Sequence, residues 1–140
     1  MELFSLSYIS KKSELLDFQD INSIYEQSLN WNKINNITGI LIEYKNHFLQ
    51  YIEGPPEEVH NLFSKIRKDS RHNNVEIFQY IEIKTRLFTS WNMLYKNLDQ
   101  VSVVESENKN QHIRERLDDI IDNKKFWEGI SVIEELSNLY

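Results

Sequence analysis

The 140-residue chain contains no cysteine, only three glycines and only two prolines. Without cysteine it has no disulfide framework, no thiolate zinc site and no sulfur nucleophile. Acidic side chains outnumber basic ones by 22 to 16, for a net charge of −6, which argues against a surface that binds nucleic-acid phosphates. No stretch approaches the ~20 consecutive apolar residues of a membrane span. The first residues place an acid before the bases, the reverse of a signal peptide, so we expect a cytoplasmic protein with no membrane partner.

Periodicity and turn residues predict a domain that mixes helices and strands. We expect strands over 3–9, 38–44, 47–53, 75–84 and 86–95, one helix from about 20 to 32, and a second helix after Pro55. A proline followed by two glutamates is typical of a helix start. The order strand, helix, strand, strand, helix, strand, with one more strand at the end, is that of an α+β, ferredoxin-like fold with a five-stranded mixed sheet.

Both faces of this predicted sheet are apolar, so helices must cover both of them. In the strand over 75–84, for example, Ile77 and Ile81 alternate with Phe78. The C-terminal region carries two further apolar stripes at helical spacing, one from Ile113 and one from Phe126. We therefore expect two helices on one face, two C-terminal helices on the other, and a polar linker over about 99–110.

Some polar residues stand where the strand or helix period requires an apolar one. Gln50 shares a strand face with Phe48, Asn32 continues the apolar stripe of the first helix, and Tyr8 shares a face with Leu6. Each residue alone is explained by an ordinary buried hydrogen bond, because buried polar groups usually find partners. Two amides and a phenol in one layer together indicate a planar, hydrogen-bonding ligand between the first two helices.

These residues belong to motifs that resemble the BLUF domain, a blue-light sensor that uses flavin. The motifs are S-Y-I-S at 7–10, N-x-x-x-x-I-T-G-x-L at 32–41, F-L-Q-Y-I-E-G at 48–54, D-x-R-H at 69–72 and R-x-F-x-x-W-x-M at 86–93. Each motif is weak alone, but five in this order over the first 95 residues are specific. The resemblance implies a non-covalently bound FAD, with FMN or riboflavin as alternatives, between the first two helices.

The resemblance also implies roles for individual residues. Tyr8 matches the donor of an electron and a proton to the excited flavin, and Gln50 matches the amide between that phenol and the ring. Rotation or tautomerisation of the amide reverses what it offers, because one end donates and the other accepts. Trp91 and Met93 match the pair in the last strand whose rearrangement carries the signal. The other cofactor-binding residues implied are Ile24, Ser28, Asn32, Lys65, Ile66, Asp69, Arg71 and His72.

One position departs from the family pattern, since Trp31 stands where other members often carry histidine or asparagine. The histidines lack metal-ligand spacing, so we expect no metal site.

Two enzymatic alternatives stay open. An acylphosphatase would need an arginine after the first strand, where Ser10, Lys11 and Lys12 offer only lysines. A flavin reductase would need a glycine-rich phosphate loop, which three scattered glycines do not supply.

We expect instead a non-enzymatic sensor over 1–98, followed over 99–140 by a linker and a helical extension that is too short for a cyclase or phosphodiesterase effector. The resemblance implies a homo-oligomer and a downstream signalling protein as partners. The lack of cysteine also excludes the thiol-adduct photochemistry of another class of small flavin sensor.

Overall fold

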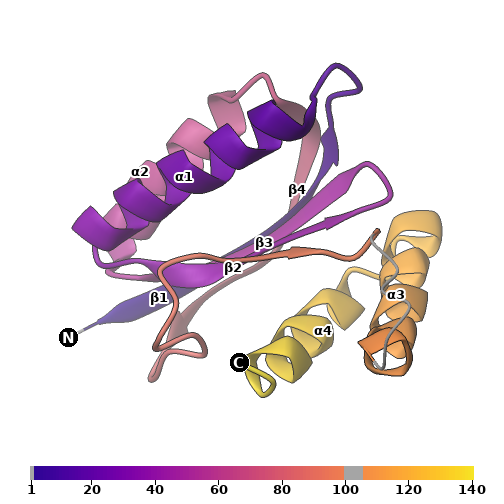
Figure 1. The fold of residues 1–140 in the computed structure, drawn as a ribbon. Coiled ribbons are helices and arrows are strands. Elements are labelled where there is room, and N and C mark those ends of the chain that lie inside the picture. Colours follow the sequence, from indigo (N-terminus) through magenta and orange to yellow (C-terminus); the bar gives the residue numbers. More distant parts are fainter. Residues whose placement is uncertain (1, 100–105) are drawn as a thin grey trace.

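The computed structural model of the protein describes residues 2–99 and 106–140, with the side chains of 106–110 excepted. The sheet lies between one pair of helices, α1 and α2, and a second pair, α3 and α4 (Figure 1). The predicted α+β architecture with helices on both faces is confirmed. In chain order the elements are β1 (Leu3–Lys12), α1 (Phe18–Ile34), β2 (Thr38–Tyr44), β3 (His47–Gly54), α2 (Pro56–Lys68), β4 (His72–Ile83), β5 (Leu94–Asn97), α3 (Ser106–Asn123) and α4 (Trp127–Ser137).

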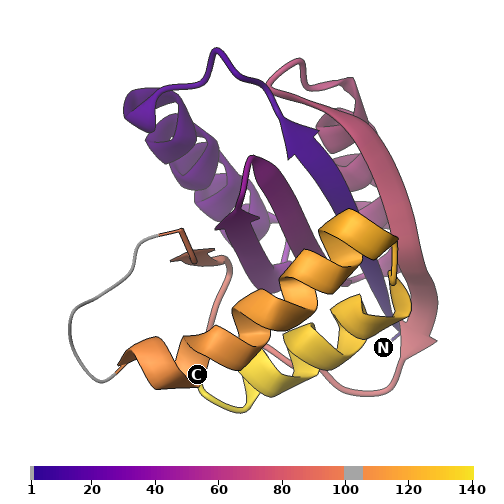
Figure 2. The ribbon, with the colours of Figure 1, turned by 90° about the vertical axis from the view of Figure 1, so that its right-hand side faces the viewer.

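The five strands form one mixed sheet in the order β4-β1-β3-β2-β5 (Figure 2). β1 is antiparallel to both β3 and β4, β2 is antiparallel to β3, and β5 runs parallel to β2 at one edge. Lys45 and Asn46 join β2 to β3 with φ angles of 45° and 61°, the left-handed conformation that two-residue hairpin turns require. The arrangement is the predicted ferredoxin-like sheet with an additional edge strand.

The last strand is much shorter than the sequence suggests. The prediction of a strand over 86–95 is wrong, because β5 spans only Leu94–Asn97 and the residues before it are irregular. The backbone amides of Leu87 and Phe88 donate to the side-chain carboxylate of Glu53, each at 2.8 Å, and not to a neighbouring strand. Their hydrogen bonds are therefore satisfied without a ladder, which apolar alternation alone does not reveal.

The helices on the first face begin where their sequences direct. Asp17 caps α1 by accepting from the amide of Asp20, whose side chain accepts in return from the amide of Asp17. α2 begins at Pro56, and Glu57 and Glu58 in its first turn suit the positive end of the helix dipole.

α1 and α2 pack on two separate hydrophobic clusters, so a seam runs between them. The α1 cluster is formed by Ile21, Leu41, Phe48 and Met93, with Ile24, Tyr25 and Leu29 against it. The α2 cluster is formed by Leu6, Tyr8, Ile37, Ile52, Val59, Leu62 and Phe63.

The C-terminal helices cover the opposite face of the sheet, as predicted (Figure 1). Gly129 of α4 lies so close to Phe78 of β4 that an added Cβ would be 2.6 Å from the ring. Among the residues described, no helix is long and apolar enough to cross a membrane. The tail cluster on this face includes Ile9, Ile40, Leu49, Tyr51, Phe88, Ile113, Leu117, Ile120, Val132, Ile133 and Leu136.

The predicted linker over 99–110 is only partly right. Its residues 100–105 lie outside the described residues, but α3 already begins at Ser106. The sequence analysis recognised this helix by its apolar stripe, which begins at Ile113. The first turns of α3 are polar and carry no such stripe, so its start was predicted too late.

Candidate functional site

The Tyr8 phenol and the Gln50 amide meet at the centre of the sheet. Tyr8 on β1 and Gln50 on β3 are direct partners in the antiparallel register. The Tyr8 hydroxyl donates a hydrogen bond to Gln50 Oε1, and both residues are only 3% exposed. At its other end the amide Nε2 approaches Met93 Sδ at 3.9 Å. The buried amide is thus held at both ends by groups that differ in hydrogen-bonding character.

The strand register explains how these groups come together. Gln50 is also the partner of Leu41 on β2, and Leu41 is the partner of Tyr95 on β5. Directly paired residues point to the same face of a sheet, so Tyr8, Gln50, Leu41 and Tyr95 form one row beneath α1 and α2. Local alternation in each strand thereby places a polar pair inside an otherwise apolar layer.

Burial keeps the Tyr8 phenol protonated. It raises the pKa of Tyr8 far above the ordinary value of 10, and the negative charge of Asp69 raises it further. The hydroxyl proton therefore stays on the phenol across the physiological range, pointing toward the Gln50 oxygen.

A cavity of about 60 Å³ opens at the seam between α1 and α2, beside this hydrogen-bonded pair. Eight of the residues that the family resemblance implies lie in its wall or its mouth. Leu41 and Phe48, which the sequence analysis did not predict as cofactor-binding residues, complete the wall because they share a face with Gln50. The lining residues are Tyr8, Ile24, Ser28, Leu41, Phe48, Gln50, Ile66, Asp69, Arg71 and His72.

Asp69 and Arg71 form an ion pair at the mouth of this cavity. The Arg71 guanidinium donates to both Asp69 oxygens, at 2.8 Å and 3.0 Å from Nε and more closely from an Nη. Hydrogen bonds from Arg71 hold the pKa of Asp69 below its ordinary value. The pair is thus charged but electrically balanced.

His72 faces the same cavity with a defined tautomer. Its Nε2 lies 2.6 Å from the Ile66 carbonyl, which only accepts, so Nε2 carries the hydrogen. In the neutral ring Nδ1 then accepts from the Ser10 hydroxyl at 2.7 Å. Both ring nitrogens are hydrogen-bonded to other protein groups, so His72 contributes to the cavity wall by packing and not by a free donor or acceptor.

A second cavity of about 240 Å³ adjoins the first and leads outward between the helices. The two share Ser28, Ile66, Asp69 and Arg71 in their linings, so they lie side by side, and together they are called the recess below. Lys65, predicted as a cofactor ligand, lines the outer part with Trp31, and its Nζ lies 3.2 Å from the centroid of the indole ring.

Asn32 and Trp91 are predicted site residues that do not line either cavity. Asn32 is fully buried and does not line either part of the recess, but its Nδ2 donates to the Asn92 carbonyl at 2.8 Å. Trp91 is 38% exposed, whereas Met93 is 1% exposed and contacts Gln50. Trp91 and Met93 both precede β5, so the prediction that they lie in the last strand is wrong.

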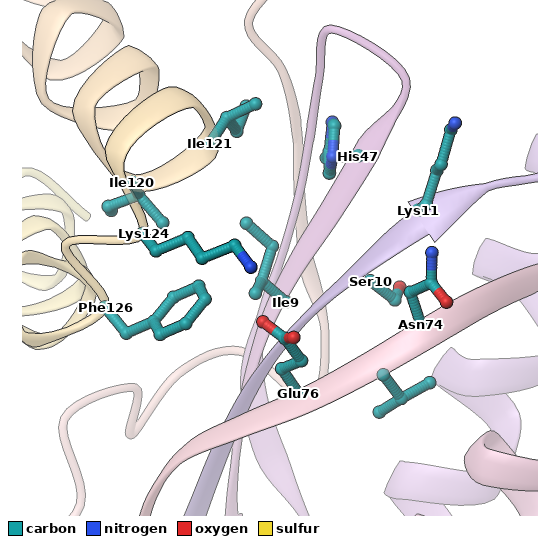
Figure 3. Close-up of a pocket in the computed structure, with 11 residues that line it drawn as sticks. Ile9, Ser10, Lys11, His47, Asn74, Glu76, Ile120, Ile121, Lys124 and Phe126 are labelled. Atoms are coloured by element: carbon teal, nitrogen blue, oxygen red, sulfur yellow. The ribbon is translucent and has the colours of Figure 1, made fainter.

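A larger cavity lies elsewhere, between the sheet and the C-terminal helices, with a volume of about 400 Å³ (Figure 3). Ile9 and Phe126 form part of its wall, and the Lys124 side chain extends from the end of α3 toward Ile9 and Glu76. None of the predicted site residues lines it. The candidate site is therefore chosen by the buried phenol and amide and not by the size of the cavity.

Comparison with known proteins places the chain in a family. A model of the BLUF family, described as sensors of blue light using FAD, matches residues 3–94. The chain belongs to the BLUF family. The predicted family and fold are thereby confirmed.

Curated BLUF relatives include photoactivated adenylate cyclases of Euglena gracilis. The chain is 35% identical over 89 residues to the alpha subunit, which is 64% of this chain and 9% of that protein. It is 32% identical over 88 residues to the beta subunit, 63% of this chain and 10% of that protein. The chain thus spans about a tenth of the length of the curated relatives it matches.

Solved BLUF structures include likenesses that reach beyond the matched domain. BlrB, a BLUF protein in its dark state, has a TM-score of 0.83 and 28% identity and covers 99% of this chain and 98% of its own. A bacterial light-regulated adenylyl cyclase has a TM-score of 0.80 and 33% identity, covering 90% of this chain and 36% of its own. The likeness to BlrB takes in α3 and α4.

Proposed function

We propose that this chain senses blue light with a flavin, FAD by family definition, held non-covalently in the recess between α1 and α2. The observation that carries the proposal is the buried hydrogen bond from Tyr8 to Gln50 in the wall of that recess. The light response of such a sensor requires a phenol that can be oxidised, hydrogen-bonded to an amide that can exchange its donor and acceptor ends.

Two residues in the wall of the recess, and one buried acceptor outside its lining, fit a flavin. The Asn32 side-chain oxygen is buried and has no hydrogen-bond partner among the described residues, so it needs a donor. The pyrimidine edge of a flavin carries one N–H between two carbonyl oxygens. Asn32 is the residue we assign to that edge, and Ile24 and Ile66 would contact the faces of the ring from the two helices.

When bound there, a flavin supplies light absorption and, once excited, an electron acceptor. Loss of an electron from the Tyr8 phenol makes its proton strongly acidic, and Gln50 Oε1 is already hydrogen-bonded to that proton. Rotation of the Gln50 amide would exchange its oxygen and its NH₂. After rotation the amide oxygen, instead of the NH₂, would face Met93 Sδ. A thioether sulfur has no hydrogen to donate to that oxygen, so the contact would be lost. Tyr8 and Gln50 together thus convert an electron transfer into a changed hydrogen-bond pattern.

We propose that residues 1–98 form the sensor and that 99–140 are its linker and helical extension. We further propose that the sensor is not an enzyme and that it acts by changing contacts within a homo-oligomer or with a downstream signalling protein. The changed pattern around Met93 would reach these contacts through the segment before β5. α3 and α4, packed on the opposite face of the sheet, would present the altered surface.

The test is reversible blue-light spectroscopy of the purified protein. We expect a yellow protein whose flavin band shifts to the red under blue light and returns in the dark. Tyr8→Phe should bind flavin and lose the shift, whereas Tyr80→Phe, which alters a half-exposed phenol on β4, should keep it. Failure to take up any flavin would overturn the proposed function, and a normal shift in Tyr8→Phe would overturn the role of Tyr8.

A further inference from the structure

β4 is a long strand at an open edge of the sheet. The order β4-β1-β3-β2-β5 leaves its outer side without a neighbouring strand, and no described element lies outside it (Figure 2). An edge strand presents unpaired backbone N–H and C=O groups, which folded proteins usually shield with lysine, proline, a bulge or a very short strand. β5 at the other edge spans four residues, whereas β4 spans twelve and contains neither lysine nor proline. Only a bulge could therefore keep the β4 edge from pairing with another strand.

Three large apolar side chains are exposed along this edge. Ile77 is 42%, Tyr80 is 48% and Ile81 is 50% exposed. The pairing of β4 with β1 is shifted at Phe78, which is an additional residue, and it is regular over 79–83. A bulge twists its strand and hinders further pairing. The segment 79–83, beyond the bulge, is therefore the part of the edge that can receive a partner strand.

The sequence of this segment is complementary to itself. When two copies are paired antiparallel about a two-fold axis at Ile81, the two Ile81 side chains face each other and Gln79 lies opposite Ile83. On the other face of the strand, the Tyr80 phenol lies opposite the exposed carboxylate of Glu82. Symmetry repeats this pairing of a hydroxyl donor with an acceptor, and it leaves no two like charges directly opposite each other. Apolar and polar groups of the edge thus both find partners in a second copy of the same strand.

Resting on the part of the proposed function in which the sensor acts through contacts between chains, we propose that 79–83 of β4 binds the same segment of a second copy. The two five-stranded sheets then continue into each other across the axis. Only five residues of each strand pair, and small interfaces are typical of weak, transient signalling contacts. α4 packs on β4 where Gly129 meets Phe78, so the interface adjoins one of the helices that we propose present the altered surface.

Because the chain has no cysteine, single cysteine substitutions test the register. Under mild oxidation, Ile81→Cys should form a disulfide-linked dimer, since directly opposed residues of an antiparallel pair lie about 4.5–5.5 Å apart, Cα to Cα. Tyr80→Cys and Glu82→Cys should not, because their two copies are about 7 Å apart along the strand and about 5 Å across it, which is beyond the reach of a disulfide. Ile34→Cys, at an exposed position of α1, measures random cross-linking.

The mass in solution tests the interface without oxidation. In sedimentation equilibrium over micromolar to millimolar concentrations, we expect the wild type to form a reversible dimer. Ile81→Lys should weaken dimerisation about tenfold or more, because it removes two apolar side chains from the contact and places two like charges opposite each other. Ile34→Lys is the matched control and should dimerise like the wild type.

Three results would overturn the proposal: a wild type that stays monomeric, a dimer that Ile81→Lys leaves intact, or Ile81→Cys cross-linking no stronger than that of Tyr80→Cys or Ile34→Cys. The blue-light shift of the flavin band is recorded on the same samples, and Ile81→Lys should keep it because β4 does not contact the Gln50 amide through this side chain. A wild type without flavin or without the shift would overturn the proposed function, whereas a normal shift in a monomeric wild type overturns the interface alone.

Discussion

Glu53 is a buried carboxylate whose removal should strongly destabilise the fold. It is 0% exposed and accepts four hydrogen bonds, from Thr38 Oγ1 at 2.8 Å, Tyr51 Oη at 2.7 Å, and the amides of Leu87 and Phe88 at 2.8 Å each. The residue therefore attaches the irregular segment before β5 to the centre of the sheet.

The magnitude follows from the four donors that Glu53→Ala would leave behind. The two hydroxyls can rotate toward other acceptors, but the amides of Leu87 and Phe88 are fixed by the backbone. An unsatisfied buried donor costs about 1–3 kcal/mol, so the two amides together cost about 2–6 kcal/mol. Part of this is recovered if water enters, and we expect the free energy of unfolding to fall by about 3–5 kcal/mol. For a domain of this size, that lowers the melting temperature by about 10–20 °C.

Urea denaturation followed by circular dichroism measures this difference. Glu53→Gln keeps the size of the side chain but turns one acceptor into a donor that faces other donors, so it should lose about 2–3 kcal/mol. Glu82→Ala, which removes an exposed carboxylate on β4, should change the stability by less than about 0.5 kcal/mol. A Glu53→Ala protein within about 1 kcal/mol of the wild type would refute the reasoning, because the amides would then have found other partners.

Two further changes test the tail packing and the state of the phenol. Gly129→Ala should lower the free energy of unfolding by about 1–3 kcal/mol in the same assay, because the added Cβ would meet the Phe78 ring and this outweighs the better helix propensity of alanine. Ser131→Ala, at an exposed position of the same helix, is its control. A Gly129→Ala protein more stable than the wild type would contradict the packing. In an alkaline titration read at 295 nm, Tyr8 should stay protonated until unfolding, because burial raises its pKa. The free energy of unfolding should fall as the pH rises past about 10, because the phenol then ionises in the unfolded state but not in the folded one. If Tyr8→Phe showed one fewer tyrosine titrating below about pH 11 than the folded wild type, the raised pKa of Tyr8 would be contradicted.

The sequence predicts those parts of the fold that rest on local alternation and helix starts. The inward faces of β1 and β3 follow from period two, and that is why the residue pattern alone singles out Tyr8 and Gln50 together. The start of α2 follows from Pro56 and the two glutamates after it. The packing of the C-terminal helices on the second face of the sheet could be predicted because that face is apolar and must be buried. The two C-terminal apolar stripes were the remaining segments able to bury it.

The parts that the sequence does not predict depend on side chains far apart in the chain. Residues 86–93 alternate like a strand, but Glu53, 34 and 35 positions earlier than Leu87 and Phe88, takes the hydrogen bonds that a strand would need. Leu41 escapes notice as a cavity wall because any strand carries such a residue, and only the register places it beside Gln50. Phe48 shares the face of Gln50 by alternation along β3, but alternation does not mark it as a cavity wall. Local patterns thus identify polar residues at apolar positions, whereas contacts between distant parts of the chain determine which apolar residues surround them.

The segment before β5 joins the two faces of the sheet. Phe88, near its start, is buried in the tail cluster under α3 and α4, and Met93, at its end, is buried in the α1 cluster beside Gln50. Between these anchors the carbonyl of Asn92 accepts from Asn32, the residue we assign to the flavin edge. Met93 is only five positions along the chain from Phe88 in the tail cluster, so we expect a displacement of Met93 to reach the backbone that holds Phe88. The Glu53 carboxylate fixes the Phe88 end by accepting from the backbone amide of Phe88. Loosening that end should weaken the connection from the flavin side to α3 and α4 even where the Gln50 response itself is intact.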